Sequence, residues 1–175
     1  MKHFQLIVLI GIVLFCLSSI SIIKDYTIEA SGQYPIIDGI KCDGIEQLDF
    51  HYHAHLNIFV NGSPYLIPGG IGIKLPDCIY WLHTHDASGL IHIESPQNNT
   101  FKLGQFFDIC GQKFNNSQIF VLKADNSTDR TLTVYLNGTT FNRTSYRDIP
   151  ILNRQDIVII YGVRPPEIPQ YRFLY

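Results

Sequence analysis

Methionine and cysteine are scarce in this chain of 175 residues, which has one methionine, its first residue, and four cysteines. Thiolate and thioether ligands suit Cu(I), and a blue-copper site needs cysteine and histidine, usually with an axial methionine. No two cysteines have the C-x-x-C spacing of many structural zinc sites. The sequence therefore excludes Cu(I)-thioether and blue-copper sites and argues against cysteine as a zinc ligand.

An excess of basic residues is also missing. The chain has 13 lysines and arginines against 15 aspartates and glutamates, with a formal net charge of −2 at pH 7. Its basic residues are scattered along the sequence, whereas nucleic-acid-binding domains gather them into a patch or stripe. We therefore expect no nucleic-acid partner.

The motifs of several metalloenzyme classes are absent as well. The chain has no H-E-x-x-H, and His83-Thr-His85-Asp86 lacks the later aspartate and histidine of an H-x-H-x-D-H signature. An amidohydrolase H-x-H would need a (β/α)8 barrel, which takes about 250 residues. Cupins place a glutamate closer to their H-x-H than Glu94 lies here.

Residues 4–23 form an apolar run without charge, long enough as a helix to cross a hydrocarbon core of roughly 30 Å. The run is longer than the core of an ordinary signal peptide, and no A-x-A cleavage site follows it. We therefore favour an uncleaved transmembrane helix over a signal peptide. Lys2 before the run favours a cytoplasmic N-terminus.

This anchor sets the expected organisation of the chain. We expect a membrane anchor at 1–24, a stalk at 25–41, an extracytoplasmic β domain at 42–163 and an extended tail at 164–175 that lies across the domain or binds a neighbour. The protein would then be a single-pass protein of the cell membrane, with its C-terminal domain facing outside.

Six of the seven histidines fall between residues 51 and 92, and histidine is the commonest metal ligand among the side chains. The first block is His51-Tyr-His53-Ala-His55. Alternate side chains of a strand point to one face, so the three histidines would project side by side. The alternate residues form an apolar row for the core: Tyr52, Ala54, Leu56, Ile58 and Val60.

The second block runs from His83-Thr-His85-Asp86 to His92-Ile-Glu94. Asp86-Ala-Ser-Gly89 is typical of a tight turn, and it would place His83 opposite His92 in a hairpin. His85 and Glu94 would share their face. We therefore predict a metal site built from two sets of candidate ligands: His83, His85, His92, Glu94 and Asp86 in the second block, and His51, His53 and His55 in the first.

Imidazole ligands without methionine or cysteine favour Cu(II) or zinc. We expect His83, His85 and His92, with at least one histidine of the first block, to bind one divalent ion. The alternative is that the histidines are surface or hydrogen-bonded side chains that bind nothing.

Two cysteines lie a few residues upstream of the histidine blocks, Cys42 before the first and Cys78 before the second. We predict a disulfide between them, as an oxidising compartment would permit. Cys110 would then be a buried free thiol; three reduced cysteines are the alternative. Six N-x-S/T sequons support export and a glycoprotein, although Pro64 makes the first a poor acceptor: Asn61, Asn98, Asn115, Asn126, Asn137 and Asn142.

The remaining pattern predicts a mainly β (α+β) domain of hairpins with one short helix. Asn61-Gly62 and Asn137-Gly138 each separate two apolar runs and indicate type I′ turns. Leu103, Phe106, Phe107 and Cys110 recur at helical spacing, with Thr100 as a possible cap and Gly111 at the end. Residues 118–123 and 157–161 are further expected strands.

Two long motifs carry a resemblance: His51-Tyr-His-Ala-His-Leu56, and Tyr80-Trp-Leu-His-Thr-His-Asp-Ala-Ser-Gly-Leu-Ile-His-Ile-Glu-Ser-Pro96 followed by Phe101 to Ile109. Together they resemble a family of uncharacterised exported or membrane-anchored bacterial and archaeal proteins, over most of residues 40–163. The resemblance implies that the histidine blocks act as one unit and implies no activity. Cys110 stands where that family has tryptophan, which argues against a functional thiol.

Two functions fit these features. The first is a membrane-anchored, extracytoplasmic protein that captures, buffers or delivers Cu(II) or zinc, or serves as an accessory subunit of a membrane complex. The second is a metalloenzyme with three histidine ligands, an open metal position and Glu94 or Asp86 as general base. A glycosylated structural domain is a third, plainer alternative.

Overall fold

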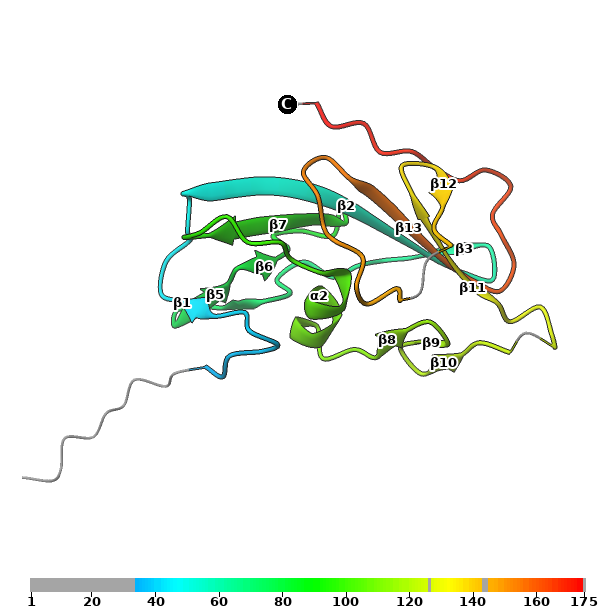
Figure 1. Ribbon diagram of the computed structural model, residues 1–175, viewed down its shortest axis with the longest axis horizontal. Helices are drawn as coiled ribbons and strands as arrows, with labels where there is room; N and C mark the ends of the chain where they lie inside the picture. Colours follow the sequence, from blue (N-terminus) through cyan, green and yellow to red (C-terminus); the bar gives the residue numbers. More distant parts are fainter. Residues whose placement is uncertain (1–33, 126, 143–144, 175) are drawn as a thin grey trace, which may run out of the picture. The chain divides into compact units, whose positions relative to one another are not determined.

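The computed structural model describes residues 34–125, 127–142 and 145–174 (Figure 1). These residues form strands β1 to β13 and one helix, α2, which confirms the expectation of a mainly β domain with a single short helix. The predicted membrane helix lies outside the described residues. Among those described, no helix has the length and apolar character needed to cross a membrane.

The main sheet holds the longest of the described strands near its centre. Its order is β12-β11-β13-β2-β7-β6, and β3 pairs with the far end of β2. β13 runs parallel to β2, whereas β7 runs antiparallel to β2. The strands are β2 (Phe50–Val60), β3 (Ser63–Tyr65), β6 (Leu82–His83), β7 (Leu90–Ser95), β11 (Leu132–Leu136), β12 (Thr139–Thr140) and β13 (Asp156–Tyr161).

Both Asn-Gly pairs form the predicted hairpin turns. Asn61 and Gly62 have φ of 51° and 81° between β2 and β3, and Asn137 and Gly138 have φ of 49° and 78° between β11 and β12. Positive φ at both central residues is what a type I′ turn requires. Local turn chemistry therefore sets the register of these two hairpins.

Two small sheets flank the main one. The first has the order β1-β5-β4, from Cys42–Asp43, Cys78–Tyr80 and Ile73–Lys74, and the predicted Cys42–Cys78 disulfide joins β1 to β5. The second contains β8 (Phe114–Asn115), β9 (Gln118–Ile119) and β10 (Leu122–Lys123). The strand expected over 118–123 is therefore two strands, because the chain turns at Phe120, whose φ is 55°.

Helix α2 (Leu103–Ile109) follows the predicted spacing, with Leu103, Phe106 and Phe107 buried. Its N-cap is Lys102 and not Thr100. The backbone N–H of Lys102 donates to Oε1 of Gln105 over 2.8 Å, and the backbone N–H of Gln105 donates to the carbonyl oxygen of Lys102 over 3.0 Å. These two contacts close the helix start. Gly111 ends it with a φ of 66°.

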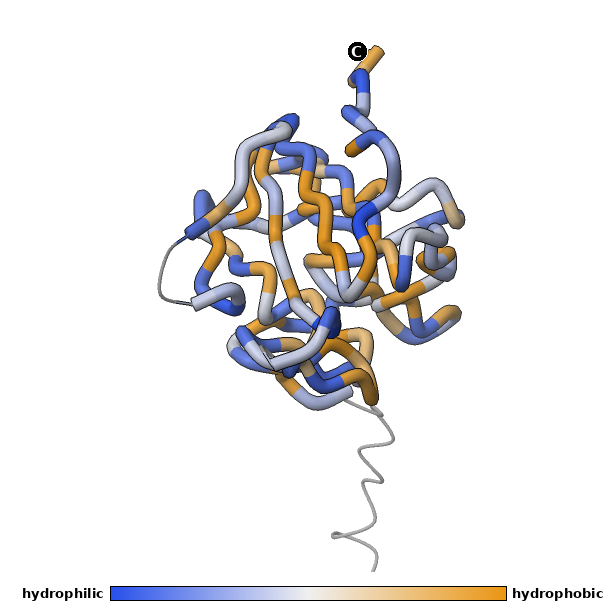
Figure 2. Tube along the Cα trace, turned by 90° about the vertical axis from the view of Figure 1, so that its right-hand side faces the viewer, coloured by the Kyte–Doolittle hydropathy of each residue, from blue (hydrophilic) through white to orange (hydrophobic). Residues whose placement is uncertain are grey.

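The core lies on one face of the main sheet. Ala54, Leu56 and Ile58 of β2 are buried there, and Phe106 and Phe107 of α2 line the same small apolar cavity as Leu56 and Ile58. Figure 2 shows the corresponding alternation of hydrophobic and hydrophilic residues along the chain. The opposite face of β2 carries the histidines.

Residues 164–174 form an extended tail that returns over this histidine-bearing face (Figure 1). The ring of Tyr171 stacks on that of His55, with centroids 3.8 Å apart and planes 11° from parallel. The backbone N–H of Tyr171 donates to Asp156 at the start of β13 over 3.0 Å. The tail thus lies across the domain, one of the two arrangements expected for it.

Candidate metal centre

Three neighbouring strands bring the histidine blocks onto one face of the main sheet. β2 pairs with β7 so that His51 lies opposite Glu94 and His53 opposite His92, and β7 pairs with β6 so that His83 also lies opposite His92. Directly opposite residues in a sheet share a face, with Cβ atoms about 5 Å apart. The strand register alone therefore gathers these side chains.

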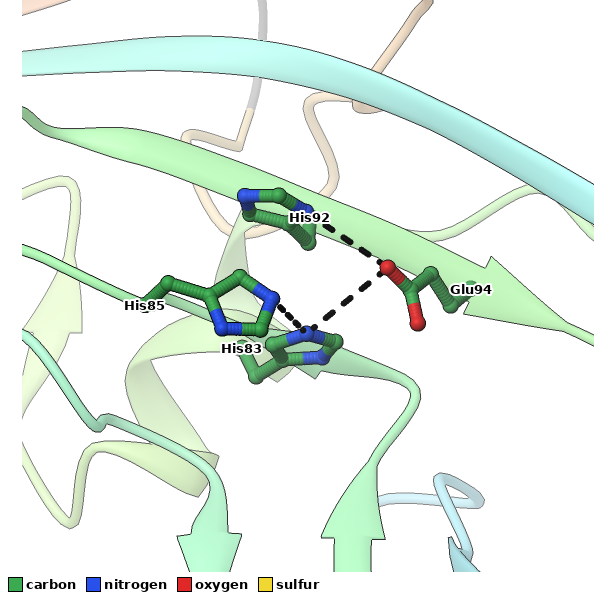
Figure 3. Close-up of side chains that lie close together, drawn as sticks. All are labelled: His83, His85, His92 and Glu94. Atoms are coloured by element: carbon green, nitrogen blue, oxygen red, sulfur yellow. Dashed lines mark hydrogen bonds and ion pairs between the residues drawn. The ribbon is translucent and has the colours of Figure 1, made fainter. Parts of the chain in front are cut away.

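The first group consists of His83, His85, His92 and Glu94 (Figure 3). Each residue offers one ligand atom, and these atoms all lie within 4.8 Å of one another. Nε2 of His83 is 3.2 Å from Nε2 of His85 and 3.9 Å from Oε1 of Glu94. Nδ1 of His92 is 3.5 Å from the same oxygen. This group could hold a metal ion.

A second group consists of His51, His53 and His92, again with one ligand atom each within 4.8 Å of the others. Nε2 of His53 lies 3.1 Å from Nε2 of His51 and 3.2 Å from Nδ1 of His92. Nε2 of His51 lies 3.2 Å from Oε1 of Glu94. The two groups therefore adjoin at His92 and Glu94.

Backbone contacts fix which nitrogen of His83 faces the cluster. Nδ1 of His83 lies 2.9 Å from the carbonyl oxygen of Tyr80. A carbonyl only accepts, so Nδ1 carries the hydrogen, and the lone pair of the neutral ring is on Nε2. An outer hydrogen bond of this kind orients metal-ligating histidines in known sites.

Burial keeps the inner imidazoles neutral. It lowers the pKa of His83 to about 4 and that of His92 to about 3, and it also lowers the pKa of His53. Neighbouring histidines lower these pKa values further, because adjacent imidazolium charges repel. Metal ions bind neutral imidazole, so these side chains are already in the ligating form at neutral pH.

Burial shifts the pKa of Glu94 in the opposite direction, upward. Its side chain is 3% exposed, and burial, followed by the charge of Glu46, raises its pKa to about 7. Its Oε2 is buried and makes no hydrogen bond within the described part of the chain. His83 and His92, two of the imidazoles beside it, are neutral at pH 7, and a bound cation would stabilise the charged form of Glu94.

His55 lies on the same strand face but apart from both groups. Its Nδ1 is 3.0 Å from Oδ1 of Asp156 and its Nε2 is 3.0 Å from the carbonyl oxygen of Ser88. With both ring nitrogens engaged and Tyr171 stacked on the ring, His55 links β2, β13, the turn before β7 and the tail. The expected inclusion of His55 among the metal-binding candidates therefore has no support in this arrangement.

Asp86 is likewise outside both groups. It is exposed, and its Oδ1 accepts the backbone N–H of Ser88 over 2.9 Å. The hydrogen bonds from Ser88 lower its pKa. An aspartate that bonds the backbone two residues on is typical of a turn, so Asp86 shapes the connection between β6 and β7.

Several residues around the cluster could not be identified as its neighbours from the sequence. Glu46 places Oε1 3.6 Å from Nε2 of His85, with both side chains exposed to solvent. Arg154 and Phe173 line a hollow of about 160 Å³ together with His51 and His53. Because these contacts join segments far apart in the chain, spacing could not have revealed them.

Comparison of the chain with known protein families, with curated proteins and with solved structures gives no significant match.

Proposed function

We propose that this protein binds a divalent transition metal, Cu(II) or zinc, on its histidine face, as an extracytoplasmic protein anchored to the membrane by residues 4–23. The observation that carries the proposal is the first group, in which His83, His85, His92 and Glu94 offer ligand atoms within 4.8 Å of one another. Imidazole and carboxylate are ligands that both metals accept.

The spacing of the nitrogens supports this reading. Two ligands bound roughly 2.1 Å from a tetrahedral ion lie roughly 3.4 Å apart, and square-planar neighbours lie somewhat closer. The three contacts between imidazole nitrogens are 3.1, 3.2 and 3.2 Å. Only small side-chain shifts are needed for neighbouring imidazoles to share an ion.

The number of donors favours binding over catalysis. Structural zinc sites use four protein ligands, whereas catalytic zinc sites use three and leave a position open. The first group offers four protein donors, so an ion there would be closed off from substrate. Capture, buffering or delivery of the metal, alone or as an accessory subunit of a membrane complex, follows more directly than metalloenzyme activity.

Two further features support an exported location. The Cys42–Cys78 disulfide fits an oxidising compartment, where such bonds persist. Residues 4–23 have the length and lack of charge of a membrane anchor. Glycosylation at the sequons belongs to the same proposal. Peptide mapping of the mature protein should recover residues 4–23, and a mature N-terminus near residue 22 or 31 would contradict the anchor.

Metal analysis tests the binding itself. The full chain, purified in detergent and stripped of metal, should retain Zn(II) or Cu(II) stoichiometrically after dialysis. His83→Ala with His85→Ala should abolish uptake at the first group and remove the rise in melting temperature that metal produces. Asp86→Asn is the matched control, because it keeps the turn hydrogen bond and should leave uptake unchanged. Unchanged uptake by the double variant would contradict the proposal.

A further inference from the structure

We propose that the histidine face holds two metal ions that share the carboxylate of Glu94, with His83 and His85 serving one ion and His51 and His53 the other. This rests on the proposed metal binding and concerns the number and connection of the ions. The second ion would lie on the side of the cluster formed by β2.

The first argument is the number of donors. Six side chains present ligand atoms, namely His51, His53, His83, His85, His92 and Glu94. They form two overlapping groups of neighbours within 4.8 Å and not one group of six. Even an octahedral ion with bonds of roughly 2.1 Å would draw all its ligands to within roughly 4.2 Å of one another. One ion therefore leaves a pair of histidines unused.

The second argument is the position of Glu94 between the two pairs. Its Oε1 lies 3.2 Å from Nε2 of His51 on one side and 3.9 Å from Nε2 of His83 on the other. Its Oε2 is buried with no hydrogen bond within the described residues. A carboxylate has two oxygens and about four lone-pair sites, so it can bind two cations at once. In known two-metal sites the ions lie about 3.5–4 Å apart.

The third argument is the environment of each pair. His83 is fully buried, and with His85, Glu94 and His92 it would enclose the first ion. His51 is 36% exposed and, like His53, lines the hollow of about 160 Å³ beside Arg154 and Phe173. His92 Nδ1 has one lone pair and can complete the sphere of only one ion. The second ion would thus keep a position open toward the hollow.

Titration with Cu(II) measures both the number of bound ions and whether two ions share the carboxylate of Glu94. The full chain in detergent is stripped of metal, titrated with Cu(II) and analysed for bound copper and by electron paramagnetic resonance. We expect two coppers per chain and a spectrum with less than two spins of intensity, because ions this close that share a carboxylate couple magnetically. His51→Ala with His53→Ala should bind one copper and give one full spin. Asp86→Asn should behave as the wild type.

The outcomes separate the two proposals. One copper per wild-type chain with one full spin would overturn the two-ion centre and leave the proposed metal binding intact. Two coppers with two independent spins would overturn the shared carboxylate. No retained copper or zinc would overturn both proposals. The wild-type result decides the question even if a variant fails to fold.

Discussion

The carboxyl group of Glu94 lies within 4 Å of three imidazoles, from His51, His83 and His92. These contacts would be ion pairs only if the histidines were protonated, yet burial lowers the pKa of His83 to about 4 and of His92 to about 3. Burial also raises the pKa of Glu94 to about 7. At the scale of the single residue, His83 and His92 are therefore neutral beside a carboxyl group of raised pKa, and a bound ion would stabilise the charged form of Glu94.

Proton release on metal binding tests this view of Glu94. At pH 6 its carboxyl, with a pKa of about 7, is largely protonated and must lose its proton to ligate a cation. We expect calorimetric titrations with zinc at pH 6, in two buffers of different ionisation heat, to show close to one more proton released by the wild type than by Glu94→Gln. The difference should shrink at pH 8, where Glu94 is already ionised. Equal proton release by both proteins at pH 6 would contradict a protonated Glu94 at that pH.

The raised pKa of Glu94 also sets the direction in which metal affinity changes with pH. Above pH 7 the carboxylate is ready to bind, and below it protons compete, so metal affinity should fall as the pH drops through about 7. His83 and His92 contribute little to this fall, since their pKa values of about 4 and 3 keep them neutral down to lower pH. The fall in affinity around pH 7 is therefore assigned to Glu94 rather than to His83 and His92.

At the scale of the secondary-structure elements, local patterns were reliable where local chemistry decides. The Asn-Gly turns, the alternation along β2 and the helical spacing of Leu103 and Phe106 all predicted what the structure contains. The cap at Thr100 was wrong because Gln105 closes the helix start through Lys102 instead. The strand over 118–123 was wrong because its backbone turns within the segment.

In the candidate site, too, the sequence predicted the features that local chemistry decides and missed those that depend on distant contacts. The hairpin between β6 and β7 was predictable, because its turn residues and the even spacing place His83 opposite His92. The pairing of β2 with β7 could only be assumed, since it depends on which strand occupies the neighbouring position in the sheet. The contact of His55 with Asp156, outside both groups, could not be predicted, because Asp156 lies 101 residues further along the chain.

The turn before β7 depends on Gly89. Its φ is 84°, and an added Cβ would meet the carbonyl oxygen of Leu56 and lie 3.2 Å from Nε2 of His55. We expect Gly89→Ala to lower the free energy of unfolding by about 3 kcal/mol, from backbone strain and overpacking together. Denaturant unfolding measures this loss, and the displaced hairpin should also weaken metal binding.

Gly39→Ala provides the matched control. Gly39 has a similar φ of 80°, but an added Cβ would meet nothing within 4 Å. Only the backbone strain remains, so the expected loss is about 1 kcal/mol. Equal losses at the two positions would show that the contact of Gly89 with β2 has no energetic weight.

At the scale of the whole domain, the Cys42–Cys78 disulfide ties the approach to the first histidine block to the approach to the second. It closes a loop of 36 residues, and in the chain-entropy model such a loop contributes about 4 kcal/mol. We expect Cys42→Ser with Cys78→Ser to lose about this much in denaturant unfolding. Cys110→Ser is the control for loss of a sulfur, since Cys110 forms no disulfide in the described structure. A loss no larger than the control's would contradict a stabilising bridge.

The C-terminal tail lies over the histidine face, and we expect that weakening its contacts changes the rate at which bound metal dissociates. Tyr171 stacks on His55, and Phe173 lines the hollow beside His51 and His53. Tyr171→Ala removes a stacked aromatic pair, which contributes about 1 kcal/mol beyond the area it buries, and should loosen the cover over the hollow. We expect faster transfer of bound zinc to a chelator, followed by stopped-flow absorbance. Leu174→Ala, at a 90% exposed position of the same tail, should leave the rate unchanged. Identical rates for Tyr171→Ala and the wild type would mean that metal leaves by a route that the tail does not cover.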